Sequence, residues 1–216
     1  MSAGGGRLPS APFIYPIVDS GLVPPGRIAD VVAALARAGA RLIQLRGKGL
    51  ADGVLLRAAR DAVAAAHAGG ALLVVNDRPD VARIAGADGV HVGQDDLAPE
   101  EARRVLGPGA VVGVSTHDLA QALAAGATGA DYVAVGPVYA TSTKERPDPV
   151  VGLALVRAAR AALAGPLVAI GGITAANAGA VAGAGADGLA VVSAVCGAPD
   201  PGAAFAALQA ALPPPR

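Results

Sequence analysis

The two lysines of this chain, Lys48 and Lys144, are the residues whose type and position first indicate a chemistry. Fifteen arginines accompany them, so the sequence uses arginine wherever a general cation suffices. A lysine ammonium is a compact point charge on a flexible stem, which follows a phosphate oxygen more easily than a planar guanidinium does. Both lysines lie in polar segments, Lys48 just after Arg46 and Lys144 after three hydroxyl residues. This pattern predicts a site for a phosphorylated ligand.

Two aspartates add the opposite charge to this predicted site. Asp77 and Asp96 each follow a short aliphatic run. Carboxylates that face each other repel unless a cation lies between them. Mg²⁺ takes one or two protein carboxylates and completes its shell with water and phosphate oxygens. With Arg46, Lys48 and Lys144, the aspartates predict a site for Mg²⁺ and a diphosphate; the alternative for each aspartate is N-capping of the following helix.

A second phosphate site is predicted at Gly171-Gly172 and Ser193. The glycine pair lets backbone N–H groups approach phosphate oxygens closely, and Ser193 adds a hydroxyl. The alternative is a tight turn with Thr174 as a helix N-cap. A monophosphate site beside a metal-diphosphate site indicates an enzyme that joins two phosphorylated substrates with loss of diphosphate.

The histidines carry less weight in this prediction. His117 is expected to cap a helix, and His91 is expected to pack near a strand. No third ligand accompanies these two histidines in the sequence, so we do not predict a zinc site.

Eight short aliphatic runs alternate with Ala- and Arg-rich segments of helical period. Runs of this kind predict strands of a parallel sheet that is buried on both faces. The expected strands are 13–19, 41–46, 72–76, 89–93, 111–115, 132–136, 167–171 and 188–193. The expected helices include 28–38, 53–67, 99–105, 119–125, 155–164, 175–182 and 201–212.

A recurring tripeptide supports the strand count. Gly-Ala followed by Arg or Asp precedes every second expected strand, and the glycine is placed to cap the preceding helix. This recurrence predicts an α/β fold, a single-domain (β/α)8 TIM barrel over residues 13–212, flanked by a flexible N-terminal tail (1–12) and a C-terminal tail (213–216). The alternative is an open, doubly wound sheet, but residues 19–25 lack its Gly-rich phosphate loop. In the barrel, the polar strand ends meet at one rim.

The composition limits the kinds of molecule that this chain is expected to bind. The formal net charge is zero and no cationic run exceeds Arg103-Arg104, which argues against nucleic acid and anionic membranes. The first twelve residues lack the apolar core of a signal peptide. The single Cys196 makes no internal disulfide and is expected to be a buried small hydrophobic residue. We expect a cytoplasmic protein with small-molecule substrates, and the sequence is compatible with a homo-oligomer.

A series of motifs from residue 13 to about residue 196 resembles the thiamine phosphate synthase family. The motifs are YPIVD (15–19), QLRGK (44–48), VNDR (75–78), GVHVGQDD (89–96), GVSTH (113–117), GPVY (136–139), TSTK (141–144), VVGL (150–153), AIGGI (169–173) and GADG (185–188). The long loop 137–149 is expected to act as a lid that excludes water. Ala140 departs from the family pattern, which often has proline there, and this puts the rigidity of the lid in doubt.

The resemblance implies a Mg²⁺-dependent transferase with two phosphorylated small-molecule substrates. It would couple 4-amino-2-methyl-5-(diphosphooxymethyl)pyrimidine to a thiazole ethyl phosphate, carboxylated or not, and give thiamine monophosphate and diphosphate. The family reacts dissociatively, so diphosphate leaves before the thiazole nitrogen attacks and no general base is obligatory.

The resemblance also assigns roles to residues. The pyrimidine diphosphate would be held by Gln44, Arg46, Lys48, Asn76 and Lys144, with Ser115 bonding near the reacting groups, and the thiazole phosphate by Thr141, Thr143, Gly172, Val192 and Ser193. The substrate-binding set also includes Leu45, Gly47 and Ser142. The catalytic residues would be Arg46, Lys48, Ser115 and Lys144, and the Mg²⁺ ligands Asp77 and Asp96.

Two alternatives remain open at this point. A thiazole tautomerase of the same fold would move a proton and would need no diphosphate site; His117 is weak support for it, while both lysines and both aspartates argue against it. A non-catalytic phosphate-binding barrel would bind ligand without turnover and would show no dependence on Mg²⁺.

Overall fold

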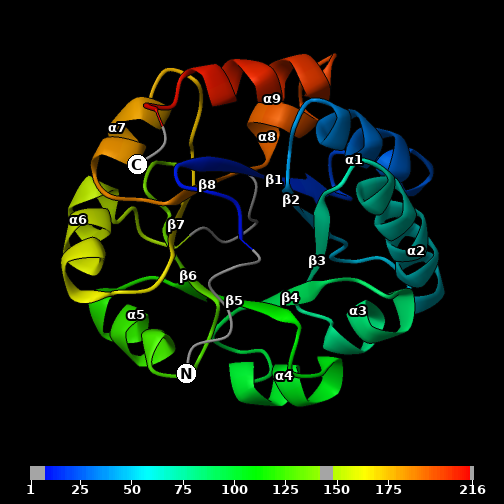
Figure 1. Cartoon of the computed structure of the whole chain (residues 1–216), viewed down its shortest axis with the longest axis horizontal. Helices are drawn as coiled ribbons and strands as arrows, with labels where there is room; N and C mark the ends of the chain where they lie inside the picture. The colour runs from blue at the N-terminus through cyan, green and yellow to red at the C-terminus, as the bar shows by residue number, and fades with distance from the viewer. Residues whose placement is uncertain (1–7, 142–147, 215–216) are drawn as a thin grey trace.

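The computed structural model describes residues 8–141 and 148–214 of the 216-residue chain and shows a (β/α)8 barrel (Figure 1). Each of eight parallel strands pairs with the next, and β8 pairs with β1 to close the barrel. In chain order the elements are β1 (Phe13–Asp19), η1 (Pro25–Arg27), α1 (Ile28–Arg37), β2 (Leu42–Arg46), α2 (Asp52–Ala68), β3 (Leu72–Asn76), α3 (Pro79–Ala85), β4 (Gly89–Val92), α4 (Pro99–Leu106), β5 (Val111–Thr116), α5 (Leu119–Gly126), β6 (Tyr132–Val135), α6 (Gly152–Ala162), β7 (Leu167–Ile170), α7 (Ala178–Gly183), β8 (Gly188–Val191), α8 (Ser193–Cys196) and α9 (Pro201–Ala210). The predicted fold is confirmed.

The expected strands agree with the observed ones to within one or two residues at each end. The largest difference is at β8, where the strand stops at Val191 and Ser193 begins the helix α8. The sequence pattern marks neither α8 nor α3, although its segment 175–182 marks the six-residue helix α7.

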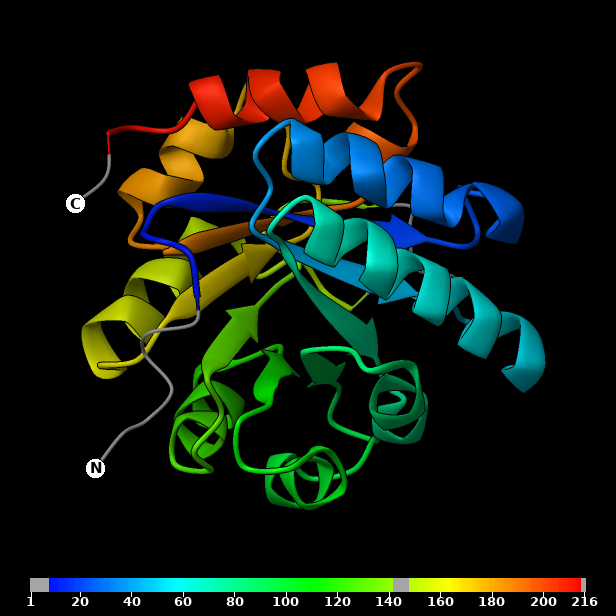
Figure 2. The ribbon, with the colours of Figure 1, turned by 45° about the vertical axis from the view of Figure 1, so that its right-hand side comes forward.

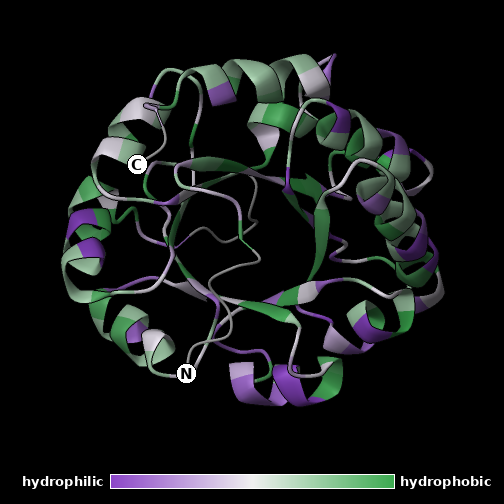
Figure 3. Cartoon of the chain, viewed as in Figure 1, coloured by the Kyte–Doolittle hydropathy of each residue, from purple (hydrophilic) through white to green (hydrophobic). Residues whose placement is uncertain are grey.

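The helices form a ring around the strands, and Figure 2 shows α1 and α2 lying side by side on its outside. Helix α1 illustrates why they pack there, since its buried residues Ile28, Val32, Leu35 and Ala36 recur at helical spacing. Figure 3 shows polar residues spread over the outer helices and apolar residues along the strands. Within residues 8–141 and 148–214, no helix is long and apolar enough to cross a membrane.

The inside of the barrel has its own apolar cluster. Alternate strand residues point inward, and the inward set is Phe13, Tyr15, Ile17, Leu42, Val74, Val111, Tyr132, Ala134, Val168 and Ala190. Leu8 packs against this cluster, so part of the stretch that the sequence pattern places in the N-terminal tail lies on the barrel. Toward the carboxyl ends of the strands the inward residues become polar, and this change creates the rim of the site.

The aspartates of the Gly-Ala-Asp repeat join neighbouring strands, a role that the sequence pattern does not reveal. The carboxylates of Asp88, Asp131 and Asp187 each accept a backbone N–H near the start of the preceding strand. Each also pairs with a basic side chain, which is His67, Arg103 and Arg160 respectively. These hydrogen bonds link β3 to β4, β5 to β6, and β7 to β8. This role accounts for the aspartate before β4, β6 and β8, whereas before β2 the same position of the repeat is Arg41.

We expect Asp131→Ala to destabilise the barrel without touching the site. Asp131 accepts from the Val112 N–H at 2.7 Å and from Arg103 at 2.9 Å. The substitution takes this acceptor from the Val112 N–H, while Arg103 keeps the Ala110 and Gly129 carbonyls. The loss of an acceptor for a buried donor should cost about 2 kcal/mol, which lowers the melting temperature by roughly 4–8 °C in a chain of this size. Asp30→Ala, which removes an exposed pair with Arg27, is the control for thermal unfolding followed by circular dichroism. Equal melting temperatures for the two variants would contradict the assignment.

Candidate active site

A cavity lies at the carboxyl ends of the strands, where inward-facing side chains and the loops after β6, β7 and β8 meet. The predicted site residues that line it are Gln44, Arg46, Asn76, Ser115, Thr141, Gly172, Val192 and Ser193. Arg46 comes from the predicted diphosphate region and Gly172 and Ser193 from the predicted monophosphate region, whereas Lys48, Asp77 and Asp96 are not among the described residues that line the cavity. The two regions therefore open into one cavity, which allows two bound molecules to meet.

Arg46 is held in place by a carboxylate from the neighbouring strand. Arg46 is the last residue of β2 and Asp19 the last residue of β1, and the two are register partners. The Arg46 Nη1 donates to Asp19 Oδ2 at 2.5 Å, while Asp19 Oδ1 accepts from the Gly21 N–H at 2.7 Å. Their side chains are 19% and 6% exposed, so this is a largely desolvated pair. Asp19 thus fixes the direction in which the guanidinium faces the cavity.

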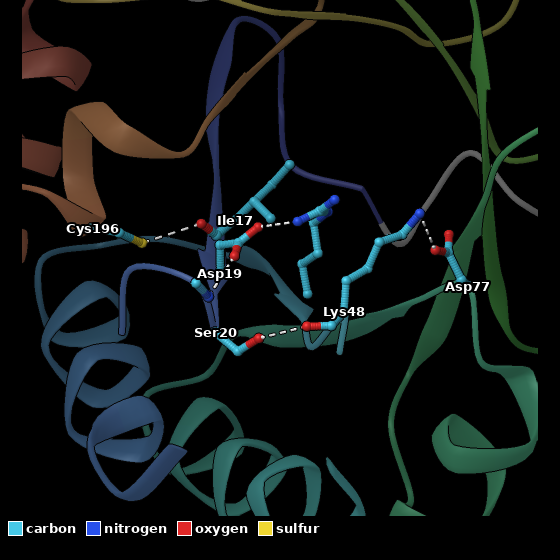
Figure 4. A network of polar contacts seen from close by, with 8 residues as sticks. Ile17, Asp19, Ser20, Lys48, Asp77 and Cys196 are labelled. Atoms are coloured by element: carbon cyan, nitrogen blue, oxygen red, sulfur yellow. Dashed lines mark hydrogen bonds and ion pairs between the residues drawn. The ribbon is translucent and has the colours of Figure 1, made fainter. Parts of the chain in front are cut away.

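Lys48, Asp77 and Asp96 form a charged cluster beside this pair. Figure 4 shows the Lys48 side chain extended toward Asp77, with Lys48 Nζ 3.3 Å from Asp77 Oδ2. The Lys48 carbonyl accepts from the Ser20 hydroxyl at 3.5 Å, which ties the loop after β2 to the end of β1. Burial raises the pKa of the Asp77 carboxyl, the nearby Asp96 carboxylate raises it further, and Lys48 offsets part of both effects. The cluster therefore concentrates negative charge that one lysine neutralises incompletely.

The backbone at Asp77 is also unusual. Its φ is +62°, which places this residue in the left-handed region. Among non-glycine residues this region is adopted most readily by Asn and Asp, and strained backbone of this kind clusters at functional sites. The turn carries the carboxylate toward Lys48 and Asp96.

The donor set fits Mg²⁺. Two neighbouring carboxylates, of which Asp96 raises the pKa of Asp77, offer the hard oxygen ligands that this ion takes. Within the part of the chain that the structure describes, no group of three or more His, Cys, Asp and Glu side chains is arranged to hold a metal. A metal at Asp77 and Asp96 would thus depend on a phosphorylated ligand to complete its shell.

The helix-capping alternatives for these polar residues are wrong. Helix α3 has Arg78 at its N-cap and α4 has Ala98, and neither helix is capped by an aspartate side chain. Asp96 Oδ2 instead accepts from the Gly93 N–H at 2.7 Å. Thr174 does not cap α7, which begins at Ala178 with Asn177 at its N-cap.

His117 does not cap a helix either. Asp118 caps α5 by accepting from the Gln121 N–H. His117 lines the cavity, where its Nδ1 donates to the Gly136 carbonyl at 2.8 Å and its Nε2 lies 3.5 Å from Asp148 Oδ2.

The loops after β7 and β8 supply backbone rather than charge. Gly171 and Gly172 have φ values of +104° and +62°. A Cβ on Gly172 would lie 2.6 Å from the Ala140 carbonyl oxygen, so only glycine lets these two loops approach. Ser193 begins α8, whose first N–H groups have no partner within the helix. These groups are suited to a phosphate.

The remaining predicted site residues lie elsewhere. The Leu45 side chain is fully buried in the core between strands and helices, so it faces away from the cavity. Gly47 follows β2 beside Leu50 and Leu55. Ser142, Thr143 and Lys144 lie outside the described residues, as does the middle (142–147) of the loop predicted to be a lid.

Sequence reasoning missed several residues at or beneath the cavity. Asp19 has its role through Arg46, which only strand pairing reveals. His91 lies in β4 and bonds Ser115 on β5, and Tyr132 and Tyr15 continue this contact across the barrel. The polar type of His91 within an aliphatic strand was the available signal.

Cys196 donates its thiol to the Ile17 carbonyl, and burial raises the pKa of this thiol to about 11, which supports an unreactive role.

The fold and the cavity define a (β/α)8-barrel enzyme with its site for phosphorylated small molecules at the carboxyl end of the strands. The family model described as thiamine monophosphate synthase matches residues 14–195. The chain belongs to this family of thiamine-biosynthetic transferases, and the resemblance seen in the motifs is confirmed.

Individual relatives agree with this assignment. The chain is 51% identical over 152 residues to the thiamine-phosphate synthase of Methanoculleus marisnigri, a match that covers 70% of this chain and 72% of the relative. It is 46% identical over 167 residues to that of Myxococcus xanthus, covering 77% and 76%. The solved thiamine phosphate pyrophosphorylase from Pyrococcus furiosus matches with a TM-score of 0.83 at 35% identity, over 92% of this chain and 94% of that one.

Proposed function

We propose that this chain condenses 4-amino-2-methyl-5-(diphosphooxymethyl)pyrimidine with a thiazole ethyl phosphate to give thiamine monophosphate and diphosphate. The bond between the pyrimidine methylene carbon and the diphosphate oxygen breaks, and its electron pair leaves with the diphosphate. The thiazole nitrogen then forms a bond to that carbon. A carboxylated thiazole would in addition lose carbon dioxide.

One observation carries the proposal, namely that a single cavity joins the cationic end of β2 to the glycine loop after β7. Arg46 and Gly172 both line it, although they come from opposite parts of the barrel. An enzyme that only binds or isomerises one phosphate ester needs one such region. Two regions facing one space support a reaction between two phosphorylated molecules.

The diphosphate would lie against Arg46 and Lys48. Asp19 holds the Arg46 guanidinium before substrate arrives, so little reorganisation is needed as negative charge grows on the leaving group. Lys144, which lies outside the described residues, is proposed as the third cation on the strength of the family motif. Asp77 and Asp96 would hold Mg²⁺, which when bound supplies positive charge to the diphosphate oxygens.

The thiazole phosphate would lie against the loops after β7 and β8. The N–H groups of Gly172 and Ser193 would donate to its oxygens, and Thr141 lines the same cavity. Thr143, outside the described residues, is proposed for the same phosphate. This arrangement would hold the thiazole ring toward Gln44, Asn76 and Ser115 on the other side.

A thiazole tautomerase is the second candidate, and the position of His117 favours it. The imidazole lies in the cavity and is oriented by the Gly136 carbonyl, as a proton-transferring group needs to be. This reading assigns no task to Lys48, Asp77 or Asp96.

An assay in which each substrate is omitted in turn separates the candidates. Thiamine monophosphate formation that requires both substrates supports the proposal. Isomerisation of the thiazole phosphate with no pyrimidine present would support the tautomerase and overturn the condensation if no thiamine monophosphate forms. Binding of either ligand without any product would indicate a non-catalytic barrel.

Gly172→Ala should weaken the binding of the thiazole phosphate and leave the binding of the pyrimidine diphosphate nearly unchanged. The new methyl group would lie 2.6 Å from the Ala140 carbonyl, and alanine is strained at a φ of +62°. We expect the KM for the thiazole phosphate to rise by about tenfold or more, as for the loss of a hydrogen bond to a charged group, while the KM for the pyrimidine diphosphate changes little. Gly179→Ala, inside α7, is the control. Equal effects on both KM values would show that the phosphate is not bound here.

A further inference from the structure

A chain of buried hydrogen bonds crosses the barrel interior beneath the cavity. Gln44 Nε2 donates to the Tyr15 hydroxyl at 2.9 Å, and the hydroxyls of Tyr15 and Tyr132 are 2.8 Å apart. The Tyr132 hydroxyl lies 3.0 Å from His91 Nδ1, and His91 Nε2 lies 2.8 Å from Ser115 Oγ. The chain begins and ends at two predicted substrate-binding residues, on β2 and on β5.

The barrel is built to accommodate this chain. Tyr15, Gln44 and Tyr132 are each 1% exposed. The Tyr132 ring lies edge-on to Tyr15 and is stacked on His91. It fits because the residue opposite on β5 is Gly113, where a Cβ would lie 2.4 Å from the Tyr132 hydroxyl oxygen. Polar groups at this depth are costly unless every one is paired.

Counting hydrogens gives the chain a direction. A carboxamide nitrogen only donates, so the Tyr15 oxygen accepts from Gln44, and among the described residues Tyr132 is the one remaining partner for the Tyr15 hydrogen. Tyr132 therefore accepts from Tyr15 and donates to His91 Nδ1. His91 then carries its hydrogen on Nε2 and donates it to Ser115 Oγ. The Ser115 hydroxyl hydrogen is left to point into the cavity that Ser115 lines.

The opposite direction leaves a buried hydrogen unused. If His91 Nδ1 carried a hydrogen, in the neutral or the charged ring, Tyr132 would accept it and would donate to Tyr15. The Tyr15 hydrogen would then have no acceptor within residues 8–141 and 148–214, because Gln44 offers its nitrogen there. Burial raises the pKa of Tyr15 to about 12 and that of Tyr132 well above its ordinary value, so both hydroxyls keep their hydrogens at neutral pH.

We propose that this chain makes the Ser115 hydroxyl a hydrogen-bond donor toward the substrate, with His91, Tyr132 and Tyr15 as positioning residues. The proposal rests on the proposed function, because it concerns the bond that Ser115 makes in that reaction. A serine hydroxyl can either donate or accept. A fixed donor favours negative charge growing on a departing oxygen, and a donor fixed in advance needs no reorganisation. Gln44 is linked to Ser115 by the same chain, which couples two contacts on opposite strands.

The tautomer of His91 tests the direction in the unmodified protein. The chain has three histidines, so the imidazole nitrogens give a small set of signals in a ¹⁵N NMR spectrum. His67→Gln and His117→Gln identify the signals that do not belong to His91. We expect His91 to be protonated at Nε2 and unprotonated at Nδ1 at neutral pH. A hydrogen on Nδ1 would overturn the proposal.

A double-mutant cycle tests the consequence for turnover. Tyr132→Phe removes the donor to His91 Nδ1, so His91 no longer has a fixed tautomer, and kcat should fall by about tenfold with little change in KM. Ser115→Ala should cost about a hundredfold, and Tyr132→Phe should add little to it, because both act on one bond. Additive losses would overturn the proposal. Tyr139→Phe makes the same chemical change in the third tyrosine of the sequence, outside the chain, and serves as the control.

Failure of the proposed function gives a different pattern. If the unmodified protein forms no thiamine monophosphate, the condensation is wrong while the His91 tautomer can still be read. If the unmodified protein is active and Tyr132→Phe matches Tyr139→Phe, the role of the chain is wrong. Melting temperatures of the variants show whether a loss of kcat reflects unfolding.

Discussion

Asp77→Asn should remove most of the activity and leave the fold as stable as before, or more stable. Burial and Asp96 raise the pKa of Asp77, so the folded protein disfavours its ionised form. A carboxyl with a raised folded pKa adds stability at low pH and loses that contribution as pH rises through the folded pKa. At neutral pH the charge of Asp77 is therefore unfavourable for folding, and asparagine removes it. Asparagine also tolerates the φ of +62° at this position.

The activity should fall because Asp77 is one of the two residues proposed to hold Mg²⁺. We expect a decrease of about a hundredfold or more in kcat/KM. We also expect Mg²⁺ and diphosphate together to raise the melting temperature of the unmodified protein and not that of the variant. Asp95→Asn, the same change at the exposed neighbour of Asp96, is the matched control. A marked drop in melting temperature would show that Asp77 is a structural residue, and activity near that of the control would exclude it as a ligand.

Arg46→Ala should instead reduce both stability and activity. Removal of the Arg46 side chain leaves the Asp19 carboxylate without its cation. This carboxylate is 6% exposed and still accepts from the Gly21 N–H. Breaking a buried pair by removing one partner costs about 3 kcal/mol, which corresponds to a decrease of roughly 6–12 °C in melting temperature. The loss of a cation from the diphosphate should reduce kcat/KM by about a hundredfold or more.

A second substitution separates the two effects. Adding Asp19→Asn to Arg46→Ala removes the unpaired charge and should restore most of the melting temperature and none of the activity. Lys48→Ala is the comparison, because Lys48 is 63% exposed and its loss should reduce activity with little change in stability. Activity that returns together with the melting temperature would show that Arg46 acts only through the fold.

The sequence predicts the barrel well because each strand has a local pattern. Aliphatic runs such as 72–76 end in a polar residue, and the Gly-Ala-Asp repeat marks the start of every other strand. The polar strand ends also predict the site, since a closed parallel barrel brings all of them to one rim. Arg46, Asn76, Ser115 and Gly172 were identified in this way and line one cavity.

What the sequence does not predict depends on contacts between distant strands. Tyr15 and Tyr132 are 117 residues apart and meet only because the barrel closes with Gly113 opposite Tyr132. Asp19 meets Arg46 through the register of β1 and β2. Leu45 shows the converse error, because membership in the QLRGK motif does not reveal that alternate residues of a strand face opposite sides.

The measurement that tests the central claim most directly is the Mg²⁺ dependence of product formation by the purified protein with both substrates. We predict that thiamine monophosphate and diphosphate form in equal amounts, that a chelator stops their formation, and that added Mg²⁺ restores it. Equal activity with and without the metal would contradict the role given to Asp77 and Asp96. Absence of both products under every condition would contradict the proposed reaction itself.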